Sequence, residues 1–165
     1  MMEEPIVNRV VQSSLKVFDL EDLYVSGPRT IIDLSQWLYE GLILREKEFR
    51  TALKDVDWSM YKDHHVALHC SSECILPQWA FTLVATHLSS EATTVAVGSL
   101  EHLETVLYEK QLAQVDFREF SGVPVILKGC SNKPVPQQAY LTAAIQLKKV
   151  AKKLMYGEAC SAVPL

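Results

Sequence analysis

Three cysteines recur in one short context, in which an apolar run is followed by Cys-Ser and then by proline. The context appears as VALHCSSECILP (66–77), VILKGCSNKPVP (125–136) and KLMYGEACSAVP (153–164). A thiolate is both a nucleophile and a ligand for soft metal ions, so three thiols in a repeated context predict shared chemistry. Such chemistry requires that the fold bring Cys70, Cys130 and Cys160 together.

The composition is that of an ordinary globular protein. The chain has 165 residues, of which 48% are hydrophobic and 22% charged, and its net charge is −4. This size suits one domain over 1–165. The chain has no basic run, which argues against nucleic acid as a partner, and no apolar run long enough to cross a membrane. The acidic N-terminus MMEEPIVNRV lacks the basic start of a signal peptide, so we expect a cytoplasmic protein.

Strand and helix patterns alternate over 61–165. The runs HVALHC, TTVAVG, VPVILKG and KKLMYGE predict four strands, and between them lie helical patterns that begin after Pro77, after Ser99 and at Pro136. This alternation predicts βαβ units and an α/β fold. We expect a mainly parallel four-stranded sheet flanked by helices in a Rossmann-like αβα arrangement.

Residues 1–60 are expected to form an extension packed on this 61–165 core. LKVFDLEDLY and RTIIDLS, separated by VSGP, predict two strands of a hairpin-like excursion. Asp33, with Gln36 three residues on, is a capping pattern ahead of a helical region that Gly41 divides in two.

The predicted sheet suggests where the cysteines meet. Ligands of open parallel sheets bind at the carboxyl ends of the strands, and Cys70, Cys130 and Cys160 all follow strand-like runs. If the strand order is the common 2-1-3-4, these three strands are neighbours about 4.8 Å apart. Pro77 and Pro136 start helices just beyond two of the cysteines, and a helix start favours the thiolate. The sequence therefore predicts a three-thiolate site.

The ligand set leaves one coordination position open. His69, Glu73 and Glu158 are the candidates for a fourth ligand. Three sulfurs with a labile fourth position suit zinc and an iron–sulfur cluster equally well. The fourth cysteine, Cys74, lacks the Cys-Ser context, and packing under the helix after Pro77 is its expected role, with a fourth metal ligand as the alternative.

Other interpretations stay open. A single free cysteine at a strand end is most often a small buried hydrophobe. A thiol-dependent sulfur or acyl transfer enzyme would use one cysteine as nucleophile, with Lys128 or Lys133 lowering its pKa. An interaction module without chemistry would use the charged helix LREKEFR (44–50) and the exposed end of the sheet. A homo-oligomer is compatible with all three interpretations.

Several motifs together resemble a known family. IVNRV, FDLEDLY, WLYEGLILREKEFR, DWSMY, CSSECILPQWA, KGCSNKPVPQQAY and GEACSAVPL resemble the bacterial proteins grouped as domain of unknown function 2480, over nearly the whole chain. The resemblance implies an association with iron–sulfur cluster assembly, and so with iron–sulfur assembly proteins as partners. It implies no reaction.

Overall fold

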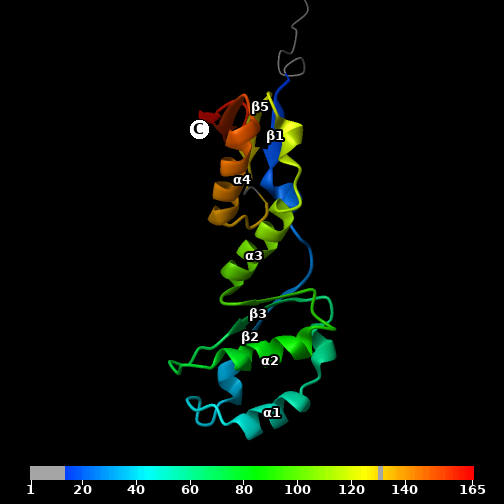
Figure 1. Ribbon diagram of the computed structural model, residues 1–165, viewed down its shortest axis with the longest axis vertical. Coiled ribbons are helices and arrows are strands. Elements are labelled where there is room, and N and C mark those ends of the chain that lie inside the picture. The colour runs from blue at the N-terminus through cyan, green and yellow to red at the C-terminus, as the bar shows by residue number, and fades with distance from the viewer. Residues whose placement is uncertain (1–13, 130–131) are drawn as a thin grey trace, which may run out of the picture. The chain divides into compact units, whose positions relative to one another are not determined.

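The chain is built from two compact α/β units. A computed structural model describes residues 14–129 and 132–165 (Figure 1). Among these residues, one unit is formed by 25–107, and the other by 14–24 together with 108–129 and 132–165. We call them the inner unit and the outer unit, after their place in the sequence. The division falls inside α3 (Leu100–Leu112). Among the described residues, no helix is both long and apolar enough to span a membrane.

The inner unit contains a three-stranded parallel sheet in the order β2-β3-β4. Its elements are β2 (Arg29–Asp33), the 3-10 helix η2 (Leu34–Trp37), α1 (Glu46–Lys54), η3 (Trp58–Tyr61), β3 (His65–His69), α2 (Gln78–Leu88) and β4 (Thr94–Val97). The sequence HVALH of β3 is buried at its first four positions, as expected of the central strand of a parallel sheet.

Alternation along β3 sends its side chains to two separate cores. Val66 and Leu68 pack with α1 and α2, in a cluster that includes Phe49 and Val84. Ala67 points to the opposite face, where it packs with Leu103 and Leu107 of α3. Helices therefore cover both faces of the inner sheet, and the carboxyl ends of its strands are left to loops.

The outer unit contains a four-stranded sheet in the order β1-β5-β6-β7. Its elements are β1 (Lys16–Asp19), η1 (Leu20–Leu23), η4 (Phe117–Phe120), β5 (Pro124–Lys128), α4 (Gln137–Val150), β6 (Lys153–Tyr156) and β7 (Val163–Pro164). All pairs are parallel except that β7 is antiparallel to β6. Val125 and Leu127 of β5 face Ala143 and Leu147 of α4 in the core, and Figure 1 shows α4 beside β5.

The predicted elements are mostly confirmed, but their assignment to one sheet is wrong. All four predicted strands form and pair in parallel, and Ser99 caps α3 by accepting the N–H of His102 at 3.1 Å. However, β3 and β4 lie in one sheet and β5 and β6 in the other. The expected hairpin of residues 15–35 is also wrong, because β1 pairs with β5 and β2 with β3. The N-terminal strands are thus parts of the two sheets, and the single domain over 1–165 stays a prediction.

Four consecutive elements of the inner unit are repeated in the outer unit at a constant offset of 59 residues. The elements η3, β3, α2 and β4 begin at residues 58, 65, 78 and 94, and the elements η4, β5, α4 and β6 begin at residues 117, 124, 137 and 153. The strand registers shift by the same amount, since His65 pairs with Thr94 and Pro124 with Lys153. Each unit therefore contains one copy of an η-β-α-β pattern, whose first strand pairs with a further strand, β2 in the inner unit and β1 in the outer unit.

Local details follow the same offset. Asp57 and Asp116 each accept the N–H two residues on, at 3.1 Å in both cases. Gly98 and Gly157 both have positive φ. Gly98 donates its N–H to the carbonyl oxygen of Leu68 in β3 at 2.8 Å, and Gly157 donates its N–H to that of Leu127 in β5 at 3.0 Å. Shared caps, turns and registers indicate an internal duplication.

The duplication shows that the cysteines do not occupy equivalent positions in the two units. At the offset of 59, Cys70 corresponds to Gly129, whereas Cys130 corresponds to Ser71. A Cβ added at Gly129 would lie 2.9 Å from Oη of Tyr140 and 3.1 Å from Cβ of Leu20, so the outer unit has no room for a side chain there. The Cys-Ser repeat is therefore not the repeat of the fold.

Candidate functional site

Asp33 ties together two strand ends at the carboxyl edge of the inner sheet. It is the last residue of β2, and its Oδ1 accepts the N–H of Ser35 at 2.9 Å and the N–H of Ser71 at 3.0 Å. The hydroxyls of Ser35 and Ser71 lie 3.1 Å apart. Hydrogen bonds, above all from the Ser71 hydroxyl and then from the backbone N–H groups of Ser71 and Ser35, hold the pKa of Asp33 far below its usual range. The edge therefore carries a fixed negative charge.

Two thiols lie beside this carboxylate. Cys70 directly follows β3 and is half-buried, and its Sγ faces the carbonyl oxygen of Ser72 at 3.9 Å. The thiol of Cys74 is within hydrogen-bonding reach of Cys70. Burial raises the pKa of the Cys70 thiol, and Cys74 and the charge of Asp33 raise it further. Cys70 is therefore a thiol at neutral pH, which is the opposite of the expectation from the helix start.

Cys74 is half-buried in the loop that follows β3, four residues after Cys70. It donates its N–H to the hydroxyl of Ser72 at 3.3 Å. Its role, packing or a fourth ligand, stays a prediction. A pair of thiols spaced as C-x-x-x-C thus stands at the strand end, with Asp33 beside it.

The same edge of the outer unit carries a different set of groups. Asp19 ends β1, and its carboxylate lies 3.3 Å from Nζ of Lys128, at the position that His69 occupies in the inner unit. Glu158 lies 3.8 Å from the same Nζ. Asp19, and then Glu158, raise the pKa of Lys128. Lys128 is thus paired with carboxylates, and Nζ of Lys133 lies over the ring of Tyr24.

The predicted metal ligands fall in both units. Cys70 and the exposed side chains of His69 and Glu73 belong to the inner unit, and the exposed Cys160 and Glu158 belong to the outer unit. Cys130 lies outside the described residues. Within 14–129 and 132–165, no three His, Cys, Asp or Glu side chains gather so that they could hold a metal ion. The three-cysteine site stays a prediction.

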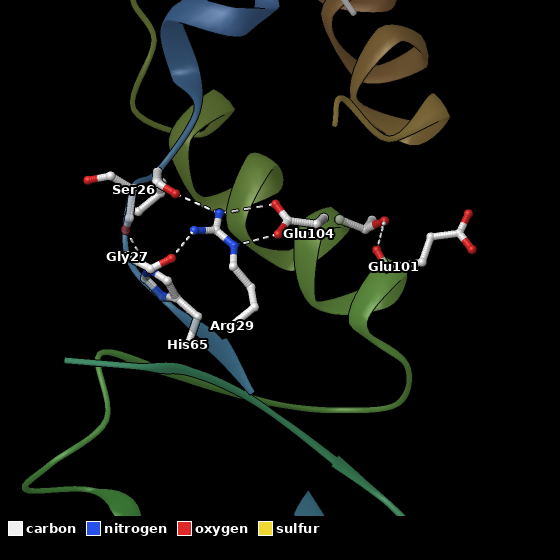
Figure 2. A network of polar contacts seen from close by, with 8 residues as sticks. Ser26, Gly27, Arg29, His65, Glu101 and Glu104 are labelled. Atoms are coloured by element: carbon white, nitrogen blue, oxygen red, sulfur yellow. Dashed lines mark hydrogen bonds and ion pairs between the residues drawn. The ribbon is translucent and has the colours of Figure 1, made fainter. Parts of the chain in front are cut away.

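A second polar network lies at the opposite, amino end of the inner sheet (Figure 2). Arg29, the first residue of β2, makes a two-point ion pair with Glu104 of α3, at 2.6 and 3.2 Å. It also donates to the carbonyl oxygens of Gly27 and Val25, each at 2.6 Å. Every partner of Arg29 named here is part of the fold itself, so this network has a structural role.

His65 closes the same end of the sheet. It is buried, and its Nε2 lies 2.8 Å from the carbonyl oxygen of Ser26, so Nε2 carries the proton and donates it. A Cβ on Gly27, which has a φ of +119°, would lie 3.0 Å from that nitrogen. The loop before β2 therefore requires glycine.

Sequence reasoning missed Asp33 and Ser35 as members of the site. A signal was present, because the pattern of two apolar residues, Asp and Leu occurs as VFDL (17–20) and as IIDL (31–34). Each copy ends a strand, and its aspartate caps a 3-10 helix. The repeated aspartate marks the carboxyl edge of both sheets.

Replacing Asp33 by asparagine is expected to reduce the free energy of unfolding at pH 7 by about 1.5 kcal/mol, since charge-assisted hydrogen bonds become neutral ones. The folded-state pKa is lowered, so the stabilisation is present above the unfolded pKa of about 3.9 and is lost as the pH falls below it. Urea titrations from pH 7 down to pH 2 should show the gap between wild type and variant narrowing below about pH 4.

Asp57→Asn is the matched control for Asp33→Asn. Asp57 caps η3 through Ser59 alone, so its replacement should cost less because no second strand end is involved. A gap between wild type and Asp33→Asn that stays constant across the pH range would show that the charge of Asp33 does not stabilise the fold.

Comparison with known proteins identifies one family. The family model described as a protein of unknown function (DUF2480) matches residues 4–165. No curated protein and no solved structure matches the chain. The family match spans both units and both polar networks.

Proposed function

The chain belongs to the DUF2480 family, and from this premise we propose that it is an accessory protein that binds zinc or an iron–sulfur cluster through cysteine thiolates at the carboxyl edge of its parallel strands. The proposal is supported by the place of Cys70 directly after β3 and next to Ser71, whose N–H donates to Asp33 at 3.0 Å, with Cys74 four residues further along the same loop. Two thiols at one strand end supply half of a four-ligand thiolate site.

The electrostatics of the pair favour binding over nucleophilic catalysis. A catalytic cysteine needs a lowered pKa, and that of Cys70 is raised. A metal ion replaces the thiol proton directly, and the adjacent charge of Asp33 attracts a cation. The alternative of a thiol-dependent sulfur or acyl transfer enzyme is therefore the weaker one.

The remaining ligands follow from the sequence expectation. Cys130 and Cys160 complete the set in the proposal, with His69, Glu73 or Glu158 as a labile oxygen or nitrogen ligand. We further propose that each unit is a minimal Rossmann-like module. The protein would then work in the cytoplasm, where thiols stay reduced, with iron–sulfur assembly proteins as its partners.

The test is metal analysis of the full chain purified without oxygen, together with its visible absorption spectrum. Wild type should carry close to one zinc ion or one cluster per chain or per dimer. Cys70→Ser and Cys74→Ser should each remove most of it, because a neutral hydroxyl replaces a thiolate poorly. Circular dichroism checks that each variant is folded.

Cys160→Ser separates the two ligand sets. Metal lost in Cys160→Ser and Cys130→Ser but kept in Cys74→Ser supports the three-cysteine set and removes Cys74 from the site. Metal lost only in Cys70→Ser and Cys74→Ser restricts the site to the thiol pair. Wild-type protein that binds neither zinc nor iron under these conditions overturns the proposal.

A further inference from the structure

Strand β4 is an uncovered edge within the inner unit. In the order β2-β3-β4, it pairs only with β3 among the described strands. Gly98 donates its N–H to Leu68 of β3, so by alternation the N–H and C=O groups of Val95 and Val97 point away from the sheet. Val97 is 54% exposed. The strand TVAV has neither the charge nor the proline that usually protects an edge strand.

The outer unit covers the corresponding edge with its own C-terminal segment. β7 pairs with β6, with Tyr156 opposite Val163, and Leu165 donates its N–H to the carbonyl oxygen of Leu154 at 3.0 Å. At the offset of 59, Leu154 corresponds to Val95 and Tyr156 to Val97. The duplicated fold thus shows what an occupied edge looks like.

A groove lies beside β4. In the outer unit, the corresponding space is divided into two pockets by the C-terminal segment that contains β7. The groove has a volume of about 460 Å³ and is lined by Leu68, Gln78, Phe81, Thr82, Ala85, Val95, Ala96 and Val97. Six of the eight counterparts of these residues line two outer pockets of about 380 and 450 Å³, and Leu165 forms a wall of the second. In the inner unit the same surface is a single groove along a bare strand.

The two edges differ in the charge of the side chains beside the added strand. In the outer unit, Nζ of Lys148 donates to the terminal Leu165 at 2.6 Å. The counterparts of Lys148 and Lys149 are Ser89 and Ser90, which carry no charge. The inner edge therefore offers no lysine beside an added strand, and it suits a segment without charge.

We propose that β4 binds an extended, uncharged, apolar segment of a partner protein, added antiparallel as a further strand. Such a segment has apolar side chains two residues apart, as Val163 and Leu165 are, so that one side chain enters the groove while its backbone bonds to Val95 and Val97. The chain's own C-terminal segment is already used on β6. This surface is distinct from the thiol pair.

The probe is a fluorescent peptide of residues 159–165 with Cys160→Ser and an amidated C-terminus, titrated into the full chain by anisotropy. Val97→Pro removes an N–H that β3 does not use, so the sheet should still form. It should weaken peptide binding by about tenfold, the loss expected for about one backbone hydrogen bond. Val97→Thr keeps the N–H and the side-chain shape, and it should bind within about twofold of wild type.

Amide shifts of the wild-type protein decide the site without any variant. Shifts centred on β4 and α2 support the proposal. Shifts centred on β6, or binding that Val97→Pro leaves unchanged, mean that the peptide displaces β7. The absence of binding means that the edge of β4 accepts no such strand. Each of these results overturns the proposal. A wild-type dimer that Val97→Pro makes monomeric identifies a second copy as the occupant, and it overturns the choice of a different partner.

Discussion

Replacing Glu104 by alanine is expected to reduce the free energy of unfolding by about 3 kcal/mol, within the range for breaking a buried ion pair from one side. The side chains of Arg29 and Glu104 are only 14% and 13% exposed. Without Glu104, the guanidinium of Arg29 keeps its carbonyl contacts but loses its two-point carboxylate partner. Chemical denaturation of the full chain, followed by circular dichroism, measures the loss.

Glu101→Ala is the matched control, because Glu101 stands on the same helix, one turn earlier, and is exposed (Figure 2). Its replacement should change the stability by less than about 0.5 kcal/mol. A double-mutant cycle that combines Glu104→Ala with Arg29→Ala isolates the interaction energy between the two side chains, which should exceed about 1 kcal/mol. Equal effects of Glu104→Ala and Glu101→Ala would mean that the ion pair adds nothing to stability.

Local patterns of the sequence predicted the elements but not their partners. The apolar runs gave all four expected strands, and proline, serine and aspartate marked the helix starts, because these signals act within a few residues. The pairing of β1 with β5 joins segments more than one hundred residues apart. No local pattern encodes that choice, so the expected hairpin was replaced by two parallel pairs.

Helix α3 is where the single-sheet prediction failed. A helix between two strands usually returns the chain to the same sheet, and the apolar positions of α3 fit that pattern. Instead, Leu103 and Leu107 pack against the inner sheet, while Tyr108 and Leu112 join the outer core. One helix thus contributes apolar residues to two cores, and its Leu100, Leu103 and Leu107 are spaced as in an ordinary crossover helix.

Only part of the candidate site was predicted from the sequence, because local patterns do not show which strands pair. The position of Cys70 at a strand end could be predicted, but Asp33 ends a strand, and Ser35 follows that strand, whose pairing could not be predicted. The internal duplication was readable in principle, since Pro77 and Pro136, and Gly98 and Gly157, share the offset of 59. The more conspicuous spacing of 60 between Cys70 and Cys130 hid it.

Leucine-to-alanine replacements at one duplicated position are expected to destabilise the two units separately. Leu68 of β3 and Leu127 of β5 correspond at the offset of 59, and each is 1% exposed. Each replacement should cost about 3 kcal/mol, since it removes buried methyl groups and leaves a cavity. Because the two leucines belong to different cores, each loss should stay within one unit.

Native-state hydrogen exchange measures where the loss appears. Leu68→Ala should speed the exchange of β2, β3 and β4, and Leu127→Ala that of β1, β5 and β6, since local opening follows cooperative units. Ile31→Ala and Val17→Ala are matched controls on the outer strands of the two sheets, at 45% and 50% exposure, and each should cost less than about 1 kcal/mol. If either core variant speeds exchange equally in both sheets, the chain unfolds as one cooperative domain, and the duplicated units are repeats of structure without being units of stability.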